Sequence, residues 1–259
     1  MEHRAPKLSE TKLTAWLRVL LFMSAMYLIA LSAPFVNILI FLFMFVITWA
    51  FVMWEGGESI VELGLELDNR VGRRLSIGAI SAALATAIVA AIAFFFGGQL
   101  RPVNEITGGL IVNVVLNAIL FSFFEELTHR GYILTRVEHL AGRKIAIVLS
   151  SVFFSLLHFS WWAPVGFNIL LIVIFTFNMF LGGVVLSFSY YWSGGSLWTP
   201  ISFHFIWNVL AYTIFPEFPQ VSVIQPEIFQ IEWGITTIIG FLFALVILWS
   251  VLVSTKKKV

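Results

Sequence analysis

The residues best suited to chemistry in this sequence are polar side chains that interrupt long apolar segments. They fall on three separate segments and comprise Glu125, Glu126 and Arg130, then His158, then His204 and Asn208. An ionisable group inside a membrane helix is costly, so each one is a functional candidate unless it is paired or lies at the interface. A glutamate beside a histidine can activate water, and a second histidine with an asparagine amide can stabilise an oxyanion. Together these groups suit hydrolysis of an amide bond without a covalent intermediate.

Spacing gives the two adjacent glutamates different roles. Glu126 and Arg130 are four residues apart, so on a helix they can form an ion pair. Glu125 lies about 100° round the helix from Glu126 and is left to face a site. His204 and Asn208 are also four apart, so both can point at one substrate atom.

A stripe of residues that recur every four positions continues from Glu125 along its segment: Asn113, Asn117, Phe121, Glu125 and His129. A mostly polar stripe on an apolar helix predicts the lining of a cavity. His129 is left outside the predicted site, because the macrodipole also favours a histidine near the C-terminal end of a helix.

The same residues allow a metal site as an alternative. Glu125, His158 and His204 would leave an open position on a catalytic zinc ion. The usual zinc signature on a helix, His-Glu-x-x-His, is absent from the sequence. The residues alone leave both interpretations open.

The composition indicates that membrane helices position these groups. Of the 259 residues, 60% are hydrophobic and 11% charged, and the mean hydropathy is +0.97. This is more apolar side chain than a soluble domain buries. There is no cysteine, which excludes disulfides and thiol catalysis. The net charge is +1 and no phosphate-binding glycine loop is present, so no nucleic-acid partner is expected.

Runs without Asp, Glu, Lys or Arg predict eight transmembrane helices of roughly 20 residues each. The runs are 19–54, 75–100, 106–124, 145–216 and 233–255. The first holds two helices, with a break near Pro34 and Asn37, and the fourth holds three, with breaks at 161–166 and 191–195. The predicted fold is therefore an all-α, polytopic, single integral membrane domain over residues 1–259. Its buried polar site is formed by helices four, five and seven.

The distribution of basic residues predicts the orientation. With eight helices every Lys and Arg except Arg101 falls on the side of the two termini. The positive-inside rule then places both termini in the cytoplasm of a multi-pass protein of the cell membrane. The polar connector 55–74 is either an interfacial amphipathic stretch or an ordinary loop.

Depth supports convergence of the three polar groups. From the expected cytoplasmic edges, Glu125 lies roughly 16 Å deep, His158 roughly 21 Å and His204 roughly 15 Å. We therefore expect one buried site. Pro200, four residues before His204, is expected to bend its helix and open a wet pocket.

Three motifs resemble those of a known family. Residues 125–130, EELTHR, resemble the EExxxR motif of the CAAX-processing and bacteriocin-processing (CPBP, or Abi) membrane proteases. FSLLH at 154–158 is similar to their FxxxH, and HFIWN at 204–208 to their HxxxN. The motifs follow the family's order on separate apolar helices. The resemblance covers a CPBP-like catalytic core at 106–212, whereas the first three helices share only their membrane-spanning character.

The resemblance implies an intramembrane endopeptidase related to the type II CAAX prenyl endopeptidase (Rce1-like), which removes the last three residues after a prenylated cysteine. Carried over by position, Glu125 and His158 would activate water, and His204 and Asn208 would bind the oxyanion. Glu126 and Arg130 would be structural support. The family has been described both as metalloproteases and as glutamate-dependent without metal. We expect no cofactor, because an Asn with a His suits an oxyanion site better than a ligand sphere. Zinc remains the alternative.

Two other function classes use the same residues. Buried carboxylates, histidines and asparagines also mark the pathways of transporters or proton-coupled carriers. An inverted repeat would favour a carrier, and the sequence shows none. The third class is a catalytically idle membrane scaffold. For the protease, the expected partners are the lipid bilayer and a membrane-associated peptide or lipidated protein, whose identity no residue specifies.

Overall fold

The chain is helical throughout the part that the structure describes. The computed structural model describes residues 11–36, 38–57, 59–162, 169–216 and 225–253, and these contain no β-strand. The long helices are α1 (Lys12–Val36), α2 (Leu39–Trp54), α3 (Val71–Phe96), α4 (Gly108–Glu126), α6 (Arg143–Trp162), α7 (Ile169–Trp192), α8 (Trp198–Ile214) and α10 (Thr236–Leu252). The shorter ones are α5 (Leu134–Ala141) and α9 (Pro226–Phe229). The all-α prediction is confirmed for these residues.

The helix ends follow local sequence chemistry. The breaks predicted near Pro34 and Asn37 and at 191–195 are present, whereas most of the break at 161–166 lies outside the described residues. The sequence predicts a bend of the helix at Pro200, but the position of this proline in α8 gives no reason for one. Because α8 begins at Trp198, Pro200 lies in the first turn, where the N–H that proline lacks has no helical partner.

Several helices have the length and composition of membrane spans. These are Lys12–Ser32, Val71–Phe96, Gly108–Ala141 and Ile169–Trp192, with Leu39–Trp54 and Thr236–Leu252 as shorter apolar helices. Large hydrophobic side chains such as Leu28, Phe95 and Val246 are exposed on the outer faces of the helices. Such faces suit lipid contact. The chain is a multi-pass membrane protein, while the count of eight spans and the orientation of the termini stay predictions.

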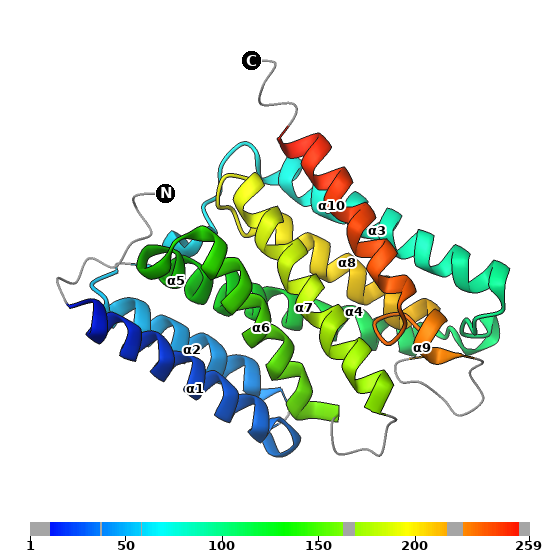
Figure 1. Cartoon of the computed structure of the whole chain (residues 1–259), viewed down its shortest axis with the longest axis horizontal. Helices are drawn as coiled ribbons and strands as arrows, with labels where there is room; N and C mark the ends of the chain where they lie inside the picture. The colour runs from blue at the N-terminus through cyan, green and yellow to red at the C-terminus, as the bar shows by residue number, and fades with distance from the viewer. Residues whose placement is uncertain (1–10, 37, 58, 163–168, 217–224, 254–259) are drawn as a thin grey trace.

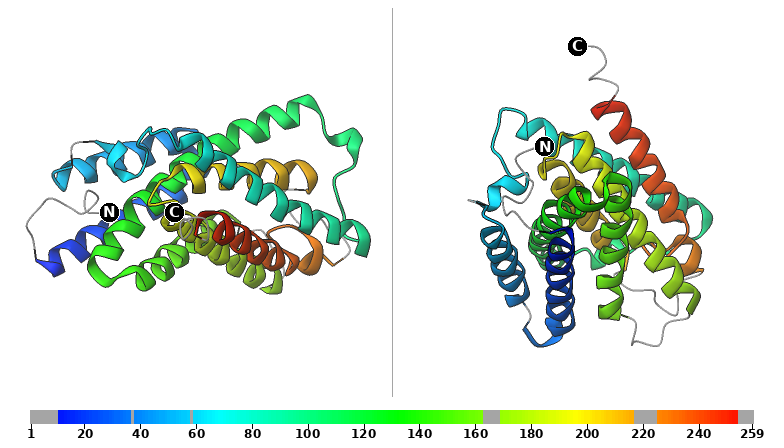
Figure 2. Two further views of the ribbon diagram at one scale, coloured as in Figure 1. Left: turned by 90° about the horizontal axis from the view of Figure 1, so that it is seen from above. Right: turned by 60° about the vertical axis from the view of Figure 1, so that its left-hand side comes forward.

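The site-bearing helices lie inside the bundle. Figure 1 shows α1 and α2 along one edge and α3 with α10 along the other, with α4, α6, α7 and α8 between them. The views in Figure 2 show α10 beside α3, and the two helices are in contact. α8 packs against α3 and α4, and α7 packs against α6.

A glycine brings α8 close to α3. A Cβ atom on Gly78 would collide with Oγ of Ser202 and with the carbonyl oxygen of Thr199. Small residues allow this kind of close backbone approach between membrane helices. The contact fixes the position of the helix that carries His204 and Asn208.

A buried ion cluster joins α1, α2 and α5. Glu55, just after α2, accepts hydrogen bonds from Arg18 at 2.8 Å, from Tyr132 at 2.6 Å and from Arg136 at 2.8 Å. Arg18 and Arg136 follow the positive-inside pattern in the sequence, yet both are buried in the structure.

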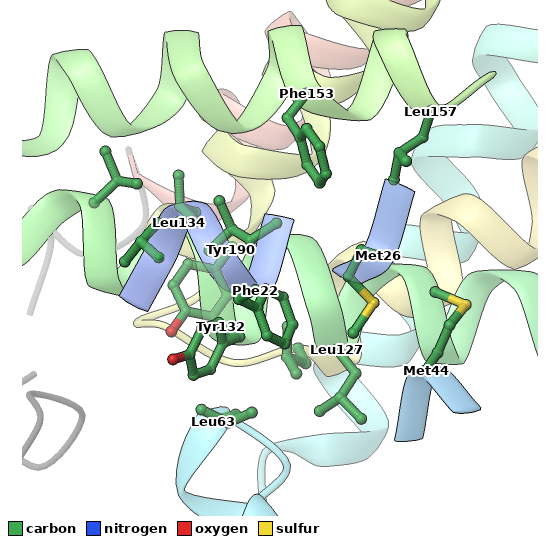
Figure 3. Packing of buried hydrophobic residues seen from close by; sticks show 14 of the residues in the cluster. Phe22, Met26, Met44, Leu63, Leu127, Tyr132, Leu134, Phe153, Leu157 and Tyr190 are labelled. Atoms are coloured by element: carbon green, nitrogen blue, oxygen red, sulfur yellow. The ribbon is translucent and has the colours of Figure 1, made fainter. Parts of the chain in front are cut away.

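Apolar packing continues round this cluster. Figure 3 shows side chains from α1, α2, the polar connector, residues 127–134, α6 and α7 that meet in one core. Among them are Phe22, Met44, Leu63, Tyr132, Phe153 and Tyr190. The connector 55–74 therefore enters the core through Leu63 and Leu65. Its last residues, 71–74, already belong to α3, and the rest of its described part is a loop with one short 3-10 turn, Ile60–Leu63. This is the second of the two predicted alternatives.

Candidate active site

A cavity of about 370 Å³ lies between α4, α6, α7 and α8. Its wall contains all four residues that the sequence analysis proposed as catalytic, Glu125, His158, His204 and Asn208. It also contains Asn113, Asn117 and Phe121, so the stripe predicted on α4 does line a cavity. Asn117 donates to the carbonyl and side-chain oxygens of Asn113, which ties this stripe together along its own helix.

A π-helical turn follows the part of α4 that lines this cavity. α4 continues through Leu127–Ile133 in π geometry into α5, and every residue of that turn is buried. From there the cavity extends along α4 to Asn113 and along α8 to Tyr212. Arg130 and Arg136 follow Glu125 along the chain and do not line the cavity. The cavity therefore leads away from the predicted cytoplasmic side.

Glu126 and Arg130 form the ion pair that their spacing predicts. Arg130 donates to Oε1 of Glu126 at 3.0 Å, and both side chains are inaccessible to solvent. The guanidinium also donates to the carbonyl oxygen of Gly183 on α7 at 3.2 Å, and its carbon lies 4.5 Å from the ring centre of Phe154. This pair therefore fixes α4 against α6 and α7.

His204 lies between the two glutamates. Its Nδ1 donates to Oε1 of Glu126 at 3.0 Å, and its Nε2 lies 3.9 Å from Oε2 of Glu125. The bond at Nδ1 determines which ring nitrogen faces the cavity. Sequence spacing predicted Glu126 as a partner of Arg130 alone, whereas the same oxygen also orients His204.

Glu125 presents an unpaired carboxylate oxygen. The residue is 6% exposed, and Oε2 has no hydrogen-bond partner among the described residues. Buried polar atoms without a partner are rare and mark places where a ligand or water is bound. Glu125 is therefore the carboxylate best placed to act on a molecule in the cavity.

A second, smaller cavity touches Glu125 from the side of α1 and α2. It has a volume of about 20 Å³, and Glu125, His129 and His158 supply its polar wall. A volume of this size holds about one water molecule. Nδ1 of His158 donates to the carbonyl oxygen of Phe154 at 2.8 Å, which leaves Nε2 as the acceptor nitrogen of the neutral ring.

The sequence analysis left His129 outside the site, but the structure places it beside Glu125. Its Nδ1 donates to the carbonyl oxygen of Glu125 at 2.8 Å. The ring is buried, and Nε2 has no partner among the described residues. The spacing of four residues between Glu125 and His129 was the signal in the sequence that the two side chains lie on the same face of the helix.

Glu232 is the residue of the cavity that the sequence analysis missed. It lies in the loop between α9 and α10 and accepts hydrogen bonds from Trp207 and Tyr212. Its position next to the last apolar run gave no indication that this loop folds back into the cavity wall.

Residues 107–210 match a family model described as type II CAAX prenyl endopeptidase Rce1-like. This match supports membership of the CAAX-processing (CPBP) family. No curated protein matches it. The matched segment begins just before α4 and ends within α8, so it contains the three motifs and stops before Glu232. Rce1-like proteins are a protease family that acts on membrane-associated substrates, and this family assignment agrees with the resemblance inferred from the motifs.

The alternative zinc site has three candidate ligands, Glu125, His158 and His204, on the cavity wall. Among the described residues, no three His, Asp or Glu side chains come together as a group that could hold a metal ion. Glu125, His158 and His204 share the cavity without forming such a group.

Proposed function

We propose that this protein is a membrane-embedded endopeptidase that hydrolyses a peptide bond near the C-terminus of a membrane-associated substrate. The observation that carries the proposal is the carboxylate of Glu125, which belongs to the cavity wall and whose buried Oε2 lies 3.9 Å from Nε2 of His204 with no hydrogen-bond partner among the described residues. A buried carboxylate with this freedom can take a proton from water as a general base.

The mechanism begins with water held between Glu125 and His158. Glu125 takes a proton from this water as its oxygen attacks the substrate carbonyl carbon, which becomes a tetrahedral oxyanion. Asn208 and His204 donate to that oxyanion. When the carbon–nitrogen bond breaks, Glu125 returns the proton to the leaving amine. Because Nδ1 of His204 already donates to Glu126, His204 can donate to the oxyanion only through Nε2 and must then carry both ring protons.

Mutagenesis of the base tests the enzyme assignment. Cleavage of an apolar fluorogenic peptide in detergent should fall at least about 100-fold in E125Q and in H158A, since general-base catalysis contributes 10²–10⁴-fold. E227Q is the matched control, because Glu227 lies in α9 and is not part of the cavity wall. Unchanged cleavage in E125Q would reject the proposal.

Metal-free catalysis is part of the proposal and has its own test. Activity should survive 1,10-phenanthroline and EDTA, and purified active protein should contain substoichiometric metal. Loss of activity with a chelator and recovery with zinc would establish the metal alternative through Glu125, His158 and His204.

The carrier alternative predicts a different phenotype for the same variant. A proton-coupled carrier reconstituted in liposomes would move protons or solute in a manner that E125Q abolishes, with no peptide cleaved by either protein. Comparison of a farnesylated CAAX peptide with its unmodified form determines whether the substrate is prenylated.

A further inference from the structure

Glu232 is a buried carboxylate on the wall of the catalytic cavity. The residue is 5% exposed. It lies in a loop that follows α9, a helix of four residues. Its backbone φ is +65°, a left-handed conformation that is unfavourable for residues other than glycine. Such conformations persist only where the surrounding structure holds them, and they cluster at functional sites.

Three helices hold Glu232 in this conformation. From α8, Trp207 donates to Oε1 at 3.0 Å and Tyr212 donates to Oε2 at 3.1 Å. From α7, the amide of Asn178 donates to the Glu232 carbonyl oxygen at 2.8 Å. At the start of α10, Oγ1 of Thr237 accepts the backbone N–H of Glu232 at 2.8 Å. The carboxylate is therefore fixed in place rather than free to turn out of the cavity.

The position of Glu232 relates directly to the proposed chemistry. Trp207 and Tyr212 lie three and eight residues after His204, which is about 4.5–12 Å farther along α8. An extended peptide advances about 3.3 Å per residue. A substrate whose scissile bond lies at His204 would bring a residue one to four positions away to Glu232.

The charge of the cavity wall indicates what that substrate residue is. Among the described residues that line the cavity, Glu125 and Glu232 carry carboxylates and His158 and His204 carry imidazoles, and no Lys or Arg is present beside Glu232. Each oxygen of Glu232 accepts one hydrogen bond and has a further lone pair. A buried carboxylate with this capacity suits a cationic donor, whereas a substrate carboxylate at the same place would be repelled.

We propose that Glu232 determines specificity by binding a cationic group of the substrate, a Lys or Arg side chain, one to four residues from the bond that is cut. This inference rests on the proposed function. A site with Glu232 at this place differs from one that binds the free C-terminal carboxylate of a substrate, because two carboxylates repel each other.

The test uses acetylated, amidated apolar peptides that place a single lysine at each position within four residues of the cut, with norleucine as the uncharged counterpart. At one position wild type should favour lysine by about tenfold or more in kcat/KM, in line with a charge-assisted hydrogen bond. E232Q, which keeps the size of the side chain, should bring this ratio close to one. E227Q should keep the wild-type ratio, because it removes a carboxylate from the same segment outside the cavity wall.

Binding provides a readout that does not depend on cleavage. In an E125Q background, the fluorescently labelled lysine peptide should bind about tenfold more tightly than the norleucine peptide, and E125Q/E232Q should lose that difference. If wild type cleaves no peptide but shows this binding preference, the proposed function fails and the assignment of Glu232 stands. A preference retained in E232Q, an equal loss for both peptides, or no lysine preference in wild type would overturn the assignment.

Discussion

His204 donates from Nδ1 to Oε1 of Glu126 at 3.0 Å, and this bond links α8 to α4. The same oxygen accepts from Arg130 at 3.0 Å. One carboxylate therefore neutralises a buried guanidinium and orients an imidazole. This double role explains why the second position of the EExxxR motif is a glutamate. The spacing along α4 explains only its pairing with Arg130.

E126Q should lower both stability and activity. Removal of one partner of a buried ion pair leaves the charge of Arg130 uncompensated and destabilises by about 3–5 kcal/mol. The ten tryptophans allow unfolding to be followed by intrinsic fluorescence in detergent. The double variant E126Q/R130M should recover part of the lost stability but not the activity, since the neutral amide oxygen of glutamine is a weaker acceptor for His204 than a carboxylate. If the loss of stability in E126Q/R130M equals the sum of the losses in E126Q and in R130M, the two residues are not coupled and the prediction is wrong.

E55Q should destabilise the fold without altering the chemistry of the folded fraction. It removes the negative charge between Arg18 and Arg136, which are both buried, and a loss of about 3–5 kcal/mol is expected. Glu55 does not line the catalytic cavity, so the kcat of the protein that remains folded should stay near wild type. D68N is the control for charge removal, because the Arg74–Asp68 pair is exposed and such pairs contribute about 0–1 kcal/mol.

Local signals were sufficient for the helices and for most of the site. Proline, glycine and polar residues mark where α1 and α7 end, and periodicity places Asn113, Asn117 and Glu125 on one face. These features depend on residues close together in the sequence. The grouping of His158 and His204 with Glu125 in one cavity could be expected from their similar depth in the membrane.

Contacts between distant segments could not be read in this way. The Trp207–Glu232 bond depends on a loop that folds back, and no periodicity extends through that loop. Arg18 and Arg136 fit the positive-inside pattern, so nothing in the sequence indicated that Glu55 draws them into the interior. The bond between His204 and Glu126 joins residues 78 positions apart and depends on how α8 packs on α4.

H129F should separate a role in the site from a role in packing. Phenylalanine preserves an aromatic ring beside Phe154, whose centre lies 5.1 Å from that of His129, but removes both nitrogens. If His129 helps to hold the water beside Glu125, cleavage should fall about tenfold or more, as general-base catalysis depends on the position of that water. Its melting temperature should stay within a few degrees of wild type, because the variant also removes an unpaired buried nitrogen. Full activity in a stable H129F protein would show that His129 does not take part in the reaction and contributes only to packing.

G78A should act on the site from a distance. The added methyl group collides with the backbone of α8 at Thr199 and Phe203 as well as with Ser202, so the helix must move as a body rather than by a side-chain rotation. Overpacking of this kind destabilises by about 1–3 kcal/mol. Because α8 carries His204 and Asn208, the displacement should also lower kcat more than it changes KM. G72A on the same helix is the matched control, since nothing lies within 4 Å of its new Cβ, and it should be neutral or stabilising by up to about 1 kcal/mol. Equal kinetics in G78A and G72A would show that the α3–α8 contact does not set the geometry of the site.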